Sequence, residues 1–167
     1  WADILLWVPD YQQALSHLTK AQSLLPKVPQ ADKIWRMKVE KQFANTYLRM
    51  HDFEKLVDVS EELKNTMLHV FPPGDSELLL VYQYLVIGYS KIGNHKKCKE
   101  YYMEICKFKD PDFTTVDFMA YSYAKENLED AVNFLKQTLK RKDWDDASRK
   151  RFLHLLGTCE KNLTGTS

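Results

Sequence analysis

Residues 82–98 read Tyr-Gln-Tyr-Leu-Val-Ile-Gly-Tyr-Ser-Lys-Ile-Gly-Asn-His-Lys-Lys-Cys and carry the clearest signal of secondary structure in the chain. Apolar and aromatic side chains recur at helical spacing up to Ile92. Gly93 suits the end of a helix, because glycine takes the left-handed conformation at no steric cost. Asn94 can then accept hydrogen bonds from the free N–H groups of a new helix. The stretch therefore predicts two antiparallel helices joined by a tight turn.

The same arrangement recurs along the chain in one register. Segments that open with a capping Asp or Asn start at positions 10, 52, 94 and 127, which gives spacings of 42, 42 and 33 residues. Fixed spacing of this kind is typical of repeat proteins. The position four residues after each cap holds a small or apolar side chain, and these are Ala14, Leu56, Cys98 and Ala131. We expect these residues to occupy equivalent places where paired helices approach closely.

Hydrophobic periodicity, caps and breaks divide the rest of the chain into helices. Stretches that contain proline or glycine separate them at 26–29, 71–75 and 110–111. The sequence predicts an all-α protein with helices at about 1–7, 10–25, 31–50, 52–70, 76–92, 94–108, 113–125, 128–140 and 145–163.

The motif of residues 82–98, with Pro111 in the closing position, resembles the tetratricopeptide repeat (TPR). The 42-residue spacing is similar to the elongated repeats of kinesin light chains. The resemblance implies a right-handed solenoid of helical hairpins, a TPR-like superhelix, in a single domain over residues 1–167. Its parts would be a partial first repeat at 1–29, repeats at 30–73, 74–110 and 111–142, and a C-terminal capping helix at 143–163.

The repeats depart from the TPR pattern at a few positions. Glu40 stands where the family usually places Trp, and Ser122 replaces Tyr in the last hairpin. Leu56 and Cys98 fill a position where the family prefers Ala. We expect less regular packing at these positions within the same architecture.

Charge and cysteine content narrow the function classes. The 24 basic side chains nearly balance the 23 acidic ones, whereas nucleic-acid binders are usually clearly basic. Cys98, Cys106 and Cys159 lack zinc-site spacing, and free thiols fit a reducing compartment. No apolar run approaches the ~20 residues of a membrane span. We therefore expect a cytoplasmic protein with protein or peptide partners, and no membrane span, nucleic-acid partner, metal or other cofactor.

The chain also lacks the common motifs of catalysis. It has no glycine-rich phosphate loop, no nucleophile elbow and no H-E-x-x-H motif. We therefore predict no catalytic residues and no enzyme activity.

In TPR proteins the first helix of each hairpin lines a concave groove that holds a partner segment. The resemblance implies a groove that is basic and polar at one end and aromatic at the other. The residues expected to contact a partner all lie on such first helices, and they are Lys38, Lys41, Asn45, Arg49, Tyr84, Lys91, Asp117 and Tyr123.

Some TPR proteins bind chaperone C-termini through a carboxylate clamp, and that motif is incomplete here. Lys41 and Asn45 match its first part. Tyr84 stands where the clamp needs Asn, and Phe113 and Asp117 stand where it needs Lys and Arg. Asp117 would repel a terminal carboxylate. The sequence therefore argues against a chaperone tail as the partner.

The leading interpretation is a protein-interaction scaffold or adaptor with a preformed groove. The alternatives are an obligate subunit of a multiprotein complex, or a regulatory domain excised from a larger enzyme or a nucleic-acid-associated factor. Basic residues at 140–142 and 149–151 flank an acidic stretch and resemble a bipartite nuclear signal, so a nuclear location is an alternative. Because basic residues near a helix end also complement its dipole, we favour a structural role for them.

Overall fold

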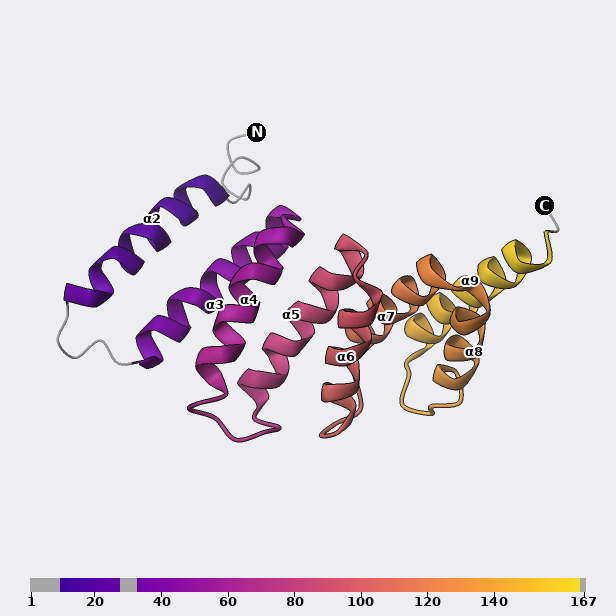
Figure 1. The fold of residues 1–167 in the computed structure, drawn as a ribbon. Helices are drawn as coiled ribbons and strands as arrows, with labels where there is room; N and C mark the ends of the chain where they lie inside the picture. The colour runs from indigo at the N-terminus through magenta and orange to yellow at the C-terminus, as the bar shows by residue number, and fades with distance from the viewer. Residues whose placement is uncertain (1–9, 28–32, 166–167) are drawn as a thin grey trace. The chain divides into compact units, whose positions relative to one another are not determined.

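The structure is a computed structural model that describes residues 10–27 and 33–165. Within these ranges every regular element is a helix (Figure 1). The element expected at 1–7 lies outside the described residues. Contacts divide the chain into two compact units, which we call the first unit (residues 1–84) and the second unit (residues 85–167).

The first unit contains α2 (Tyr11–Leu24), a 3-10 turn (Leu25–Lys27), α3 (Lys33–Met50) and α4 (Phe53–Met67). It also holds the beginning of α5 (Ser76–Ile92). Helix α3 packs against both α2 and α4 (Figure 1). The core of the first unit is formed mainly by buried side chains of α3, α4 and α5, among them Phe43, Ala44, Leu56, Leu63, Met67, Leu78 and Val81.

The second unit holds the end of α5 and four further helices, α6 (His95–Cys106), α7 (Phe113–Glu126), α8 (Leu128–Thr138) and α9 (Asp146–Thr164). Helix α7 packs against α6 and α8, and α9 packs against α8 and α7. Phe152 anchors α9: its side chain is fully buried, and its ring centroid lies 5.2 Å from those of both Phe113 and Trp144. Helix α9 therefore covers the last hairpin.

Capping residues start the helices where the sequence predicts. Every observed helix end lies within three residues of its predicted position. The carboxylate of Asp52 accepts a hydrogen bond from the backbone N–H of Lys55, and Asn94 and Asn127 cap α6 and α8 in the same way. Such caps satisfy N–H groups that have no partner inside the helix.

The turns of the first two complete hairpins share one geometry. Gly93 has a φ of 80°, and His51 takes the same left-handed conformation with a φ of 59°. In both turns the next residue donates its N–H to a tyrosine carbonyl, from Asp52 to Tyr47 at 3.0 Å and from Asn94 to Tyr89 at 2.9 Å. His51 therefore occupies a position that favours glycine.

The small-residue position of the repeats is buried in each complete hairpin. Leu56, Cys98 and Ala131 are all 0% exposed, whereas Ala14 is half-buried. The repeat register read from the sequence therefore selects equivalent buried positions on α4, α6 and α8. Among the described residues, no helix is both long and apolar enough to cross a membrane.

Candidate partner-binding site

The predicted contact residues of the first unit lie on α3 and α5, and several of them bind each other. The Lys41 ammonium lies 2.5 Å from the Glu77 carboxylate. The Tyr84 hydroxyl donates to the Asn45 side-chain oxygen at 2.6 Å, and burial raises the pKa of Tyr84. These contacts link α3 to α5, so a carboxylate ligand would have to compete with Glu77 and Tyr84 for Lys41 and Asn45.

The other predicted residues of the first unit are exposed. Lys38 lies on the surface of α3, with its ammonium 4.6 Å from the centre of the Trp35 ring. Arg49 is exposed in the last turn of α3. A pocket of about 240 Å³ lies beside Lys38 and is lined by Ile34, Met37, Lys38, Lys41, Met67, Phe71 and Glu77.

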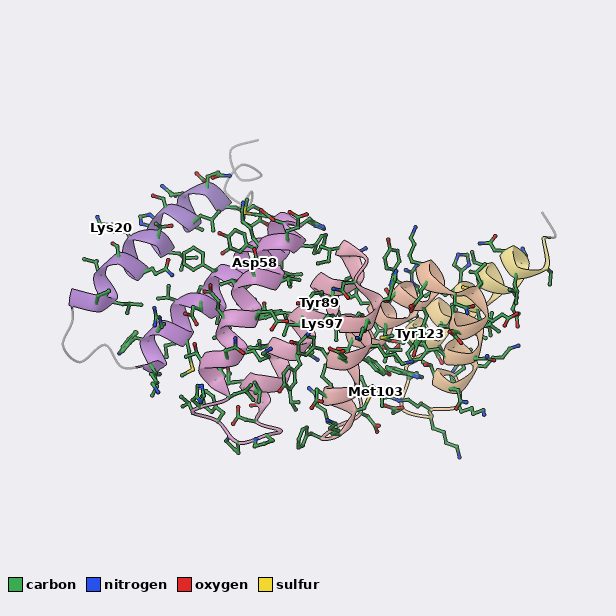
Figure 2. The ribbon with its side chains drawn as sticks, in the orientation of Figure 1. Lys20, Asp58, Tyr89, Lys97, Met103 and Tyr123 are labelled. Atoms are coloured by element: carbon green, nitrogen blue, oxygen red, sulfur yellow. The ribbon has the colours of Figure 1, made fainter. Side chains whose placement is uncertain are left out.

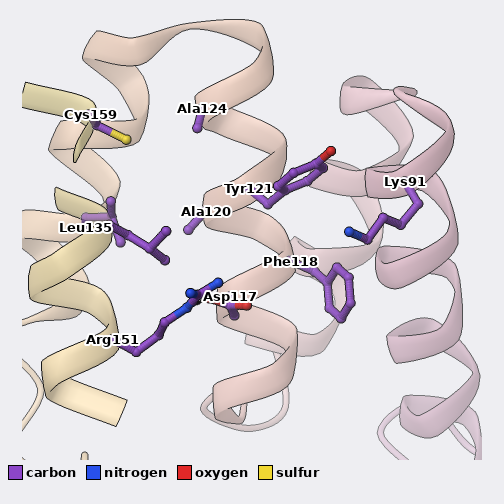
Figure 3. Close-up of a pocket in the computed structure, with 10 residues that line it drawn as sticks. Lys91, Asp117, Phe118, Ala120, Tyr121, Ala124, Leu135, Arg151 and Cys159 are labelled. Atoms are coloured by element: carbon purple, nitrogen blue, oxygen red, sulfur yellow. Dashed lines mark hydrogen bonds and ion pairs between the residues drawn. The ribbon is translucent and has the colours of Figure 1, made fainter. Parts of the chain in front are cut away.

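A second pocket lies wholly within the second unit, and we call it the alanine pocket (Figure 3). It is lined by side chains of α5, α7, α8 and α9, namely Lys91, Asp117, Phe118, Ala120, Tyr121, Ala124, Leu135, Arg151, Leu155 and Cys159. Ala120 and Ala124 are one helical turn apart on α7, and their small side chains leave the space open. Its volume is about 190 Å³. A dry cavity of about 150 Å³ can hold benzene, so the alanine pocket has room for one ring-sized apolar group.

Charged side chains surround the alanine pocket. The Lys91 ammonium lies 4.4 Å from the centre of the Tyr121 ring and 5.3 Å from that of Phe118 (Figure 3). Lys125 lies 5.7 Å from the Tyr121 ring on the same helix face. Arg151 of α9 pairs with Asp117 of α7 at 3.3 Å. The lining therefore carries two cations, Lys91 and Arg151, and one carboxylate, Asp117, and Lys125 adds a third cation beside the Tyr121 ring.

The structure brings Lys91 and Asp117 to one site but places Tyr123 elsewhere. Tyr123 is half-buried and packs against Phe134 of α8, with ring centroids 5.1 Å apart (Figure 2 labels Tyr123). Sequence reasoning missed Tyr121 and Arg151. Tyr121 could have been found, because it lies four residues after Asp117 on the same helix face. Arg151 is 34 residues from Asp117, and no local pattern joins them.

The basic residues that resemble a nuclear signal have internal contacts. Arg141 donates to the Pro111 carbonyl at 2.9 Å. Arg149 donates to the carbonyls of Leu139 at 3.2 Å and Arg141 at 3.0 Å. Arg149 thus satisfies carbonyl groups at and after the end of α8, and Arg141 ties the segment after α8 to the segment before α7, which agrees with a structural role.

Neither a metal site nor an activated nucleophile is evident in the described ranges. They contain no group of three or more His, Cys, Asp or Glu side chains placed to hold a metal ion. Burial raises the pKa of the Cys98 thiol to about 11, so the thiol is protonated near neutral pH and is a poor nucleophile. The alanine pocket offers a ligand apolar contact inside and charged groups at its rim.

Comparison with known proteins adds evidence on the fold. No protein-family model and no curated protein matches the sequence. A crystal structure of nearly identical TPR-like repeats, from a Podospora anserina protein assigned as a kinesin light chain, is similar with a TM-score of 0.75. The match has 15% sequence identity and covers 93% of this chain and 80% of that chain. The chain therefore has the all-helical fold of a TPR-like repeat solenoid.

Proposed function

We propose that the chain is a protein-interaction scaffold that binds a partner segment along the first helices of its hairpins. The observation that carries this proposal is the alanine pocket, a preformed space for one apolar side chain with charged groups at its rim. A preformed site lowers the conformational entropy lost on binding. The repeats at 30–73, 74–110 and 111–142 would present such sites, and the helix at 143–163 would close the last one.

The rim of the alanine pocket indicates the chemistry of the partner segment. The ammonium groups of Lys91 and Lys125 lie 4.4 and 5.7 Å from the centre of the Tyr121 ring, whereas Asp117, the carboxylate that lines the pocket, already pairs with Arg151. A segment with an apolar side chain and neighbouring carboxylates would complement both the cavity and the cations. Because the rim is exposed, we expect salt to weaken this binding.

We also propose that the partner is a protein and that the chain works in the cytoplasm. Cys98, Cys106 and Cys159 are free thiols, which supports a reducing compartment. The balanced net charge of +1 gives no support for a nucleic-acid partner. Lys38, Lys41 and Arg49 would provide further contacts to a partner on the surface of the first unit.

The proposal can be tested by selecting binders from a random phage-displayed peptide library against the folded chain. Calorimetry would then give the affinity of a selected peptide for the wild type and for two variants. Lys91→Glu reverses a charge at the rim, and Ala124→Leu fills the alanine pocket. Ala147→Leu, an exposed site on α9, is the matched control for added apolar volume.

We expect the selected peptides to carry an apolar residue beside acidic ones. Lys91→Glu should weaken binding about tenfold, the typical cost of losing one charged contact. Ala124→Leu should abolish binding, and Ala147→Leu should leave it unchanged. Failure to enrich any peptide, or equal affinity for the wild type and both pocket variants, would contradict the proposal.

A further inference from the structure

A separate groove lies within the first unit and is lined by side chains of α2, α3 and α4. We call it the acidic groove. Its volume is about 220 Å³, and it is lined by Gln22, Phe43, Tyr47, Lys55, Asp58, Val59 and Glu62. The rings of Phe43 and Tyr47 belong to α3 and are stacked with centroids 6.1 Å apart. The groove therefore combines an aromatic surface with charged walls.

The charge of this groove is negative. Asp58 and Glu62 are both exposed on α4 (Figure 2 labels Asp58), and their spacing of four residues places them on the same helix face. Lys55 is the cation among the lining residues, and its ammonium already lies 2.8 Å from the Asp52 carboxylate. The carboxylates of Asp58 and Glu62 therefore line the groove, and the lysine that lines it is already paired with another carboxylate, that of Asp52.

A buried carboxylate on α3 interacts electrostatically with the groove, although it does not line it. Glu40 is only 5% exposed, with Arg36 3.5 Å from one of its oxygens. Its other oxygen has no hydrogen-bond partner among the described residues. Burial raises the pKa of Glu40, Arg36 opposes this rise and Glu62 adds to it. Glu40 therefore senses the charge of Glu62, one of the carboxylates that line the acidic groove.

We propose that the acidic groove binds an arginine side chain of a partner protein. A guanidinium group is planar, so it can stack on the Tyr47 ring while its N–H groups reach Asp58 and Glu62. The Tyr47 ring already attracts a cation, because the Lys55 ammonium lies 5.6 Å from its centre. Lysine offers neither the planar shape nor the two-pronged hydrogen bonding.

This groove is distinct from the alanine pocket in place and in charge. The alanine pocket belongs to α5, α7, α8 and α9, and cations dominate its rim. The acidic groove belongs to α2, α3 and α4, and carboxylates dominate its walls. The two sites would select partner segments of opposite charge, and one can fail experimentally without the other.

The test is an NMR titration of the full, isotope-labelled chain with the blocked peptide acetyl-Ala-Arg-Ala-amide. A peptide with citrulline in place of arginine is the control ligand, because it keeps the shape and removes the charge. Both titrations would be repeated with the double variant Asp58→Asn, Glu62→Gln. Glu54→Gln removes an exposed carboxylate of α4 that does not line the groove, so it is the matched control variant.

We expect the arginine peptide to shift amide signals of Phe43, Tyr47 and residues 55–62, and the citrulline peptide to leave them in place. The double variant should weaken binding about tenfold or more, and Glu54→Gln should bind as the wild type does. Arginine should also lower the pKa of Glu40 in the wild type, because binding and ionisation are reciprocally linked. Equal shifts with citrulline, or undiminished binding by the double variant, would overturn the proposal, as would an equal loss with Glu54→Gln.

Discussion

The substitution Leu56→Ala distinguishes two predictions of stability, one from the repeat pattern and one from the packing around Leu56. The same repeat position holds Ala131 in α8, so a pattern-based view predicts that alanine fits at position 56 as well. The structure predicts otherwise. Leu56 is 0% exposed in the core of the first unit, and truncation of a fully buried leucine to alanine costs about 2–5 kcal/mol because a cavity remains. We expect a loss near 3 kcal/mol in the free energy of unfolding.

Urea unfolding followed by far-ultraviolet circular dichroism would measure this loss, and the slope of the transition should stay unchanged. Repeat proteins can unfold in parts, so hydrogen exchange of α3 and α4 should report the same loss locally. Leu68→Ala, at a leucine that is 47% exposed, is the matched control and should change stability by less than about 0.5 kcal/mol. A loss below about 1 kcal/mol for Leu56→Ala would refute the packing argument.

Three further predictions concern single residues. Glu40→Gln should raise the melting temperature near pH 7 and have little effect near pH 3. The pKa of Glu40 is raised in the folded state, so the stability it contributes below its unfolded-state pKa is lost as the pH rises through its folded-state pKa; an equal effect at both pH values would contradict this. His51→Gly should raise the free energy of unfolding in urea by about 1 kcal/mol, because glycine adopts the left-handed conformation without strain. The loss of the ring contact between His51 and Phe53 reduces this gain. A lower free energy of unfolding would contradict the prediction and show that the ring contact outweighs the strain. Cys106 is exposed and Cys98 is buried, so a thiol reagent should label Cys106 first in mass spectrometry, and prior labelling of Cys98 would disprove the burial.

The fold could be predicted from the sequence because its signals are local. Asp52, Asn94 and Asn127 each cap a helix at the predicted place. Capping depends on a side chain and the next three residues, which the sequence displays directly. His51 shows the limit of such reasoning. Its left-handed conformation follows from the turn geometry that it shares with Gly93. The residue type histidine does not predict that conformation, as glycine does at position 93.

The candidate site was harder to predict because its contacts join distant residues. The sequence predicts that Lys41 and Asn45 of α3 face a groove. In the structure, Glu77 and Tyr84 of α5 bind these two side chains. These partners lie 36 and 39 residues away, and only the stacking of the hairpins brings them together. The open space of the alanine pocket likewise depends on how α9 packs against α7. Sequence periodicity gives the face of a helix but not the gap between two helices.

The most direct test of the scaffold proposal is to locate a selected peptide on the chain by intermolecular nuclear Overhauser effects. The account predicts contacts from the peptide's apolar side chain to the methyl groups of Ala120 and Ala124, and from its flanking residues to Lys91. Contacts confined to other surfaces, with the two alanine methyl groups unaffected, would contradict it.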